Sequence, residues 1–196
     1  MVWIDGAMVQ SCIRRDAREN GDSKVTETIR TAIEAASAYL LEHRDEARYT
    51  DSPAKARVEE GLRIRVEGPE GEVLTTDMPG GVGGGGSAPS PGWFLRASVA
   101  ACVTSLAVMR AAQLGIEGFT CEVEVDSQSD DYGILGLELS VPAGPLSMRI
   151  SIHVTAEDSE PDLVAEVAKW AVDHCPVSDA IRRAIPTTVD VNYQTD

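Results

Sequence analysis

The segment at residues 91–114 constrains the fold of this chain most strongly. Its apolar residues recur on almost every side of a helix rather than along one stripe. A helix of this length with no polar face has to be covered all round, so we expect it to be buried at the centre of the structure. Pro91 suits the first turn of such a helix, and Gly115 is typical of the residue that follows a helix C-terminus.

Segments with the two-residue alternation of β-strands stand on both sides of this helix. Before it, residues 62–66 and 72–76 predict a hairpin that turns at residues 68–71. After it, the alternation predicts three antiparallel strands at residues 119–125, 135–141 and 148–154. One face of this sheet should cover the helix.

The remaining patterns complete an α+β order of elements. Residues 25–43 have helical spacing, Ser159 and Pro176 each mark the start of a further helix, and residues 189–193 alternate like a strand. Residues 1–22 lack periodicity. We therefore expect a poorly ordered arm at 1–22, an amphipathic helical extension at 23–50 and a single domain at 51–196.

Composition limits the partners of the chain. Its 196 residues are 43% hydrophobic, which is enough for one good core, and its formal net charge is -15. Such an acidic chain is a poor ligand for nucleic acids or anionic membranes, which need clustered Lys and Arg. The sequence shows no signal-peptide pattern and no run that approaches a membrane span, so we expect a cytoplasmic protein. Four cysteines in that reducing compartment favour a transient disulfide over permanent ones.

Two cysteines stand in contexts that suit redox chemistry. Cys102 lies in the apolar helix, where a core cysteine is the simpler interpretation, but Ser98 and Ser105 lie on its side and could donate to a thiolate. Cys175 precedes Pro176 at a helix N-terminus, which favours the thiolate, although it could serve only as a cap. A sulfenic acid condenses readily with a nearby thiol, so the two suit a redox pair.

Other candidate residues have structural interpretations. The glycine-rich loop at residues 78–91 is expected to be mobile and to flank the site, and its match to a dinucleotide fingerprint at 81–86 is rejected because no helix follows directly. No pattern indicates a metal site or a Ser-His-Asp triad. The remaining interpretations are a structural Cys121, an exposed Cys12, a solvated His153, a surface or packing His174, and a turn at Asp130 and Asp131.

Residues 91–102 and 174–181 resemble the two cysteine motifs of the OsmC/Ohr family, the osmotically inducible and organic hydroperoxide resistance proteins. The resemblance extends over residues 56–193. It implies an OsmC-like fold, in which an antiparallel sheet wraps around a buried central helix, and an intertwined homodimer. It also implies a peroxiredoxin-like reduction of organic hydroperoxides without cofactor or metal. Cys102 would attack the peroxide, Cys175 would resolve the sulfenic acid, and a dithiol would restore both.

The chain departs from the family's peroxidases at two places. Gly92 stands where they have a glutamate, and residues 76–91 lack the arginine that pairs with it and steadies the thiolate. Arg96 should point away from Cys102, which leaves arginines on the preceding strands as possible substitutes: Arg57, Arg63 and Arg65. Two functions follow, either a slow hydroperoxide reductase or a non-enzymatic dimer that binds a hydrophobic ligand or senses oxidants.

Overall fold

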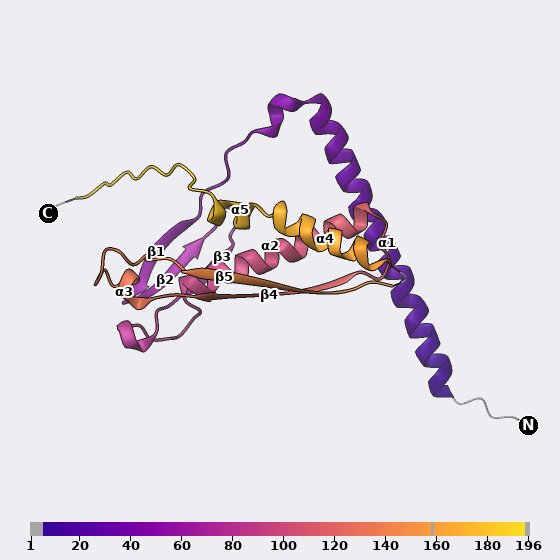
Figure 1. Cartoon of the computed structure of the whole chain (residues 1–196), viewed down its shortest axis with the longest axis horizontal. Helices are drawn as coiled ribbons and strands as arrows, with labels where there is room; N and C mark the ends of the chain where they lie inside the picture. Colours follow the sequence, from indigo (N-terminus) through magenta and orange to yellow (C-terminus); the bar gives the residue numbers. More distant parts are fainter. Residues whose placement is uncertain (1–5, 158, 195–196) are drawn as a thin grey trace, which may run out of the picture.

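The structure is a computed structural model that describes the backbone of residues 6–157 and 159–194, and the side chains of this range from residue 23 onward. Helices and two separate sheets alternate along the chain, which confirms the α+β class (Figure 1). Helix α2 (Pro91–Gln113) is the element that the others contact most, and it corresponds to the predicted apolar helix.

The ends of α2 follow from its sequence. Ser90 caps the first turn, because its side-chain oxygen accepts a hydrogen bond from the Trp93 N–H at 3.3 Å, and Pro91 occupies the first helical position. Gly115 follows the helix with a φ of 70°, which is unfavourable for other residues. The sequence-based bounds of this helix are confirmed.

The core lies between α2 and helix α4 (Pro161–Asp173). Small side chains recur every fourth residue along one face of α2 and let α4 approach closely. Cys175, just after α4, belongs to the same cluster. The buried cluster consists of Val99, Val103, Ala107, Ala111, Ile116, Val167, Ala171 and Cys175.

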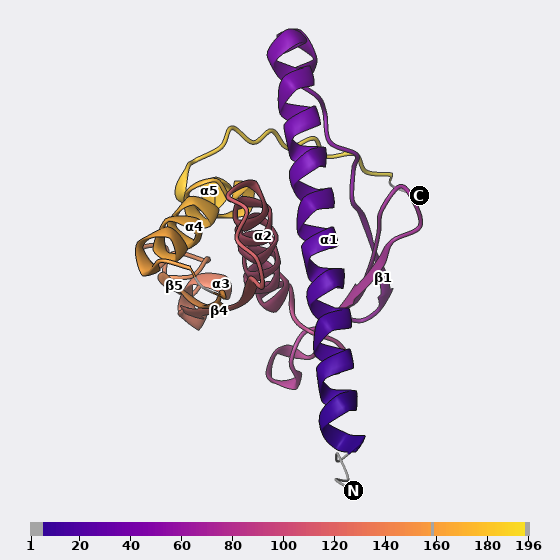
Figure 2. The ribbon, with the colours of Figure 1, turned by 90° about the vertical axis from the view of Figure 1, so that its right-hand side faces the viewer.

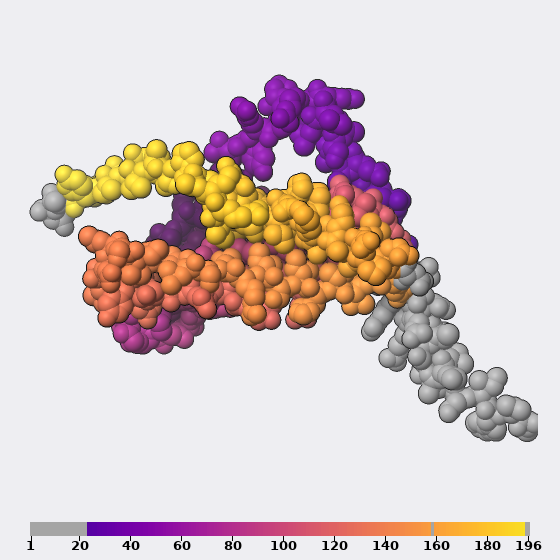
Figure 3. Space-filling view, viewed as in Figure 1, coloured from indigo at the N-terminus to yellow at the C-terminus, as the bar shows by residue number. Residues whose placement is uncertain are grey.

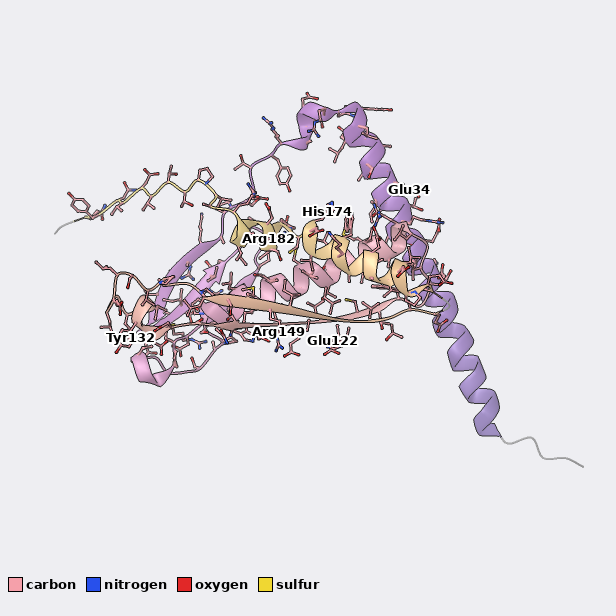
Figure 4. The ribbon with its side chains drawn as sticks, viewed as in Figure 1. Glu34, Glu122, Tyr132, Arg149, His174 and Arg182 are labelled. Atoms are coloured by element: carbon pink, nitrogen blue, oxygen red, sulfur yellow. The ribbon has the colours of Figure 1, made fainter. Side chains whose placement is uncertain are left out.

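A long hairpin covers another side of α2. Strands β4 (Thr120–Gln128) and β5 (Ser147–Thr155) pair antiparallel along their whole length, as predicted for the first and third strands of this region. Alternate residues, Cys121 and Val123 among them, pack against the core. Glu122 and Arg149 lie on the opposite, outer face of the hairpin (Figure 4).

The predicted strand at residues 135–141 is wrong. A short helix α3 (Asp131–Ile134) is followed by Gly136 with a φ of 66° and by irregular chain, in which the Leu139 side chain is fully exposed. Strands β4 and β5 pair directly with each other, so no position is left between them for a third strand. The leucines alternate, but nothing within the described part of the chain covers them.

A second sheet contains β1 (Lys55–Glu60), β2 (Arg63–Glu67) and β3 (Val73–Thr76) in that order. The predicted hairpin is confirmed by the antiparallel pairing of β2 with β3, whereas β1 was not predicted. This sheet lies on the other side of α2 from α4 and α5 (Pro176–Arg182) (Figure 2). Apolar side chains of the sheet, including Val58 and Leu74, are exposed.

The two ends of the chain extend from this body. Helix α1 (Gly6–Glu42) crosses α2, and a 3-10 turn η1 (Arg44–Ala47) follows it. Its backbone is helical in most of the segment for which the sequence predicts a disordered arm, and residues 1–5 lie outside the described residues. At the other end, the predicted strand at residues 189–193 is wrong, because these residues are irregular and extend away from the body (Figure 3).

Complete burial of α2 is not reached within one chain. Trp93 near the start of the helix and Met109 near its end are both exposed. In length and composition α2 would also suffice to cross a membrane, so the sequence-based statement that no run approaches a span is too strong. Core helices of soluble proteins have the same composition, and one face of α2 is packed against α4.

Candidate thiol site

The structure brings Cys102 and Cys175 together, although they are far apart in the sequence. Cys102 lies on α2 and is half-buried, whereas Cys175 is the N-cap residue of α5 and has no exposed surface. Both are free thiols, and the Cys102 side chain packs against the buried cluster that contains Cys175. Each thiol also shifts the pKa of the other. The start of α5 therefore places one thiol beside the other in the core.

The environment of Cys175 favours its thiolate. Burial alone would raise the pKa of Cys175, but the opposing hydrogen bonds are stronger and leave the pKa below its ordinary value. The Ser178 N–H donates to the Cys175 sulfur at 3.3 Å, and the Ser178 hydroxyl and the Cys102 thiol act in the same direction. The Ser178 hydroxyl is buried and has no other partner among the described residues, and it lies near enough to the sulfur to lower the pKa of Cys175.

The environment of Cys102 favours its neutral thiol. Burial raises the pKa of Cys102, the hydrogen bond with Cys175 raises it further, and only the Val177 N–H opposes them. One thiol of the pair is thus polarised as the hydrogen-bond donor and the other as the acceptor. Because the two interact directly, their titrations belong to the pair as a whole.

The serines beside Cys102 do not act on its sulfur. The Ser98 hydroxyl donates to the Leu95 carbonyl at 2.8 Å, and the Ser105 hydroxyl donates to the Ala101 carbonyl at 2.9 Å. Hydroxyls within a helix commonly bond to the preceding turn in this way. The expectation that these serines could stabilise a Cys102 thiolate is therefore wrong.

The arginines considered as substitutes have other partners. Arg57 and Arg65 each donate to the Glu67 carboxylate at 2.7 Å, and Arg63 donates to Glu59 at 3.1 Å. Arg96 donates to the Ser127 hydroxyl at 3.3 Å, consistent with its expected direction away from Cys102. Within the described part of the chain, no arginine contributes to the pKa shift of Cys102.

The glycine-rich loop is tied around a buried carboxylate. Asp77, which is 3% exposed, accepts hydrogen bonds from the backbone N–H groups of Met78, Gly85 and Ser87 and from the Ser87 hydroxyl. These bonds, led by those of Ser87, hold the pKa of Asp77 below its usual value. Arg63 in turn donates to the Ser87 hydroxyl at 2.6 Å. The loop expected to be mobile is therefore anchored to the second sheet.

The other singled-out residues have structural roles. His174 at the end of α4 stacks on Trp170 and lies near Arg182 of α5, and it contacts the Trp170 carbonyl through Nδ1 (Figure 4). Cys121 packs against the core, His153 is exposed, and the Asp130 side chain caps α3. The Cys12 side chain lies outside the described residues. Among the described residues no group of three or more His, Cys, Asp or Glu side chains is placed to hold a metal.

Two residues with clear roles were not foreseen from the sequence: Ser178 beside the thiols and Asp77 within the glycine-rich loop. Ser178 follows Cys175 by three residues, which is the spacing of a capping contact, so the segment Cys175–Ser178 carried a readable signal. Asp77 carried no such signal, because its partners are brought to it only by the turns of the loop.

These features define an α+β protein in which a cysteine of a long apolar helix meets a second cysteine at the start of a later helix. The sequence profile of the OsmC-like protein family matches residues 84–190. The chain belongs to this family, as its two cysteine motifs indicated. No protein of curated function matches the sequence.

Solved structures share the fold at low sequence identity. An OsmC-like protein from Mycoplasma pneumoniae is 14% identical with a TM-score of 0.58, over 70% of this chain and 91% of that chain. An organic hydroperoxide resistance protein from Legionella pneumophila is 24% identical with a TM-score of 0.50, over 69% and 91% of the two chains. One from Elizabethkingia anophelis is 19% identical with a TM-score of 0.50, over 70% and 91%. At these identities the likeness establishes the fold.

Proposed function

We propose that this protein reduces organic hydroperoxides at the expense of a dithiol, with Cys102 and Cys175 as its redox pair. The observation that carries the proposal is that the two thiols pack together at one place in the core, with the pKa of Cys102 raised and that of Cys175 lowered. Family membership and the likeness to proteins described as organic hydroperoxide resistance proteins support the choice of substrate. We also propose the reducing cytoplasm as its location.

The contact suits a balanced two-step reaction. The Cys102 sulfur attacks the terminal oxygen of ROOH, the O–O bond breaks, and the Cys102 proton passes to the departing RO⁻ to give ROH. Cys102 is left as a sulfenic acid. The Cys175 thiolate then attacks the Cys102 sulfur, forms the disulfide and releases hydroxide. The raised pKa of Cys102 predicts a slow first step at neutral pH, because little of this thiol is ionised.

Stopped-flow consumption of cumene hydroperoxide by the reduced protein tests this function. Cys102→Ser should abolish consumption, whereas Cys175→Ser should allow one turnover and leave a sulfenic acid that dimedone traps. Cys121→Ser is the matched control, since this thiol is also half-buried but packs only against the core. Consumption by all three variants at the rate of an ordinary free thiol would refute the proposal.

We further propose that the active form is a homodimer. Apolar side chains are exposed in three separate parts of the single chain: the second sheet, residues 135–141 and residues 189–193. The last two segments alternate between apolar and polar residues as strands do. A second copy would cover them and complete the enclosure of α2. The substitution Leu139→Glu should lower the mass measured by light scattering from that of a dimer to that of one chain. A wild-type protein that is monomeric at every concentration would refute this.

A specific observation also favours the second function, a non-enzymatic protein that binds a hydrophobic ligand or senses oxidants. No arginine in the described part of the chain acts on Cys102, and Gly92 replaces the glutamate of the family's peroxidases. In that case aryl or alkyl compounds should raise the melting temperature, and peroxide consumption should not exceed that of a free thiol. Rapid turnover without any such stabilisation would exclude this function.

A further inference from the structure

The donors that act on Cys175 come largely from a single residue, Ser178. Its backbone N–H reaches the sulfur at 3.3 Å, and its hydroxyl is buried without a partner among the described residues. The whole residue is 6% exposed, so water does not readily satisfy this hydroxyl. A buried hydroxyl without an acceptor is costly, and an anionic sulfur beside it supplies one.

The two sulfurs differ in their access from outside. Cys175 has no exposed surface, whereas Cys102 keeps part of its surface open. A thiol that arrives from solution therefore reaches the Cys102 sulfur first. In thiol–disulfide exchange the preferred leaving group is the thiol of lower pKa, provided that the other sulfur can be attacked.

We propose that Ser178 is a positioning residue that holds the Cys175 sulfur as an anion, so that a dithiol attacks Cys102 of the oxidised pair and expels Cys175. The inference rests on the redox pair proposed above and concerns the return of that pair to its reduced form.

The exchange is balanced in two steps. One thiolate of the dithiol attacks the Cys102 sulfur, the bond between the two cysteines breaks, and Cys175 leaves with the electron pair. The second thiolate of the dithiol then attacks the dithiol's own sulfur in the mixed disulfide. Cys102 leaves, takes up a proton and becomes the neutral thiol, while the reductant departs as a disulfide.

The charged groups around Cys175 are engaged elsewhere. On α4, Asp173 pairs with Lys169, and at the end of the helix His174 bonds to the Trp170 carbonyl. On α5, Asp179 pairs with Arg183.

Two arginines nearby also have partners of their own. Arg182 donates to the Val172 carbonyl at 3.3 Å, and Arg110 of α2 pairs with Glu166 of α4. Cys102 is therefore the titratable group in direct contact with Cys175, and Ser178 is the neutral donor whose removal should move its titration.

The first test is thiolate absorbance against pH, measured in a Cys12→Ser background. Cys121 titrates late, because burial raises its pKa. Ser178→Ala should move the first thiolate titration up by about one pH unit, the size expected for one hydrogen bond to an ion. Ser178→Thr should restore it, and Ser105→Ala, which removes a hydroxyl bonded to a backbone carbonyl, should leave it unchanged. Unaltered titration in Ser178→Ala would overturn the inference.

The second test needs no variant. The pair is oxidised with diamide, exposed briefly to glutathione and quenched in acid, and the adduct is located by peptide mass spectrometry. Glutathione should be found on Cys102, and adducts mainly on Cys175 would overturn the inference. Neither test uses peroxide, so a protein that passes both and fails to consume hydroperoxide would refute the proposed function alone. A working peroxidase with adducts on Cys175 would refute only the role of Ser178.

Discussion

Substitution of Val167 by alanine tests whether the contact between α4 and α2 is the main core of this chain. Val167 is 0% exposed and belongs to the central cluster. Removing its two buried methyl groups forfeits about 0.8 kcal/mol each. The cavity that remains adds about 1 kcal/mol if the site collapses only in part. The expected loss in the free energy of unfolding is therefore about 2.5 kcal/mol.

Urea unfolding followed by circular dichroism measures this loss. A chain of this size should have a urea dependence of roughly 2–3 kcal/mol/M, so Val167→Ala should lower the midpoint by about 1 M with an unchanged slope. Val82→Ala is the control, because Val82 is 42% exposed on the 3-10 turn η2 (Gly80–Val82), and it should change stability by less than about 0.5 kcal/mol. Protein concentration is held constant, since any association would shift the midpoint.

The result that would refute the reasoning is a midpoint for Val167→Ala that equals the Val82→Ala midpoint. Packing against α2 would then contribute little, and the position of Cys175 after α4 would need another explanation. If the reasoning holds, Val167→Ala should also slow the formation of the Cys102–Cys175 disulfide by diamide, because a loosened α4 holds Cys175 less firmly against its partner. Mass spectrometry after timed quenching measures that rate.

The glycine-rich loop gives further predictions. Gly84→Ala should disrupt the loop, because a Cβ there would lie 1.9 Å from the Met78 carbonyl oxygen. Gly80→Ala is the control, since a Cβ at Gly80 would meet nothing within 4 Å. Limited proteolysis should therefore cut the loop faster in Gly84→Ala only. Asp77 has a lowered pKa in the folded chain, so its stabilisation is complete above the unfolded pKa and is lost as the pH falls through the folded one. Asp77→Asn should therefore lower stability at neutral pH and flatten the acid limb of unfolding below about pH 4. An acid limb as steep as the wild type's would contradict this role.

Local patterns predicted the elements whose partners lie within the chain. The caps of α2 and the alternation of β2, β4 and β5 depend on neighbouring residues, and these elements are confirmed. The segments at 135–141 and 189–193 alternate equally well but form no strand. Alternation tells which side chains could be covered, and it does not tell which strand would lie beside them.

The sequence predicted which two cysteines form the candidate site, but it did not predict which of the two thiols is more readily ionised. The two motifs identified Cys102 and Cys175, yet the hydroxyls of Ser98 and Ser105 turn to helix carbonyls. The donor that matters, Ser178, acts because α5 starts at Pro176 and folds it back over the sulfur. Which of two thiols is ionised depends on contacts within a few ångströms, and residue spacing alone does not give them.

The contact between a cysteine of α2 and one at the start of α5 has a topological consequence. A bond between these sulfurs would close a covalent ring that contains the whole β4–β5 hairpin and all of α4. Closing a ring of about 70 residues lowers the entropy of the unfolded chain by an amount worth roughly 4 kcal/mol. The oxidised and reduced forms would then differ in their resistance to unfolding and to proteases, so the lifetime of the protein in a cell would itself record its redox history.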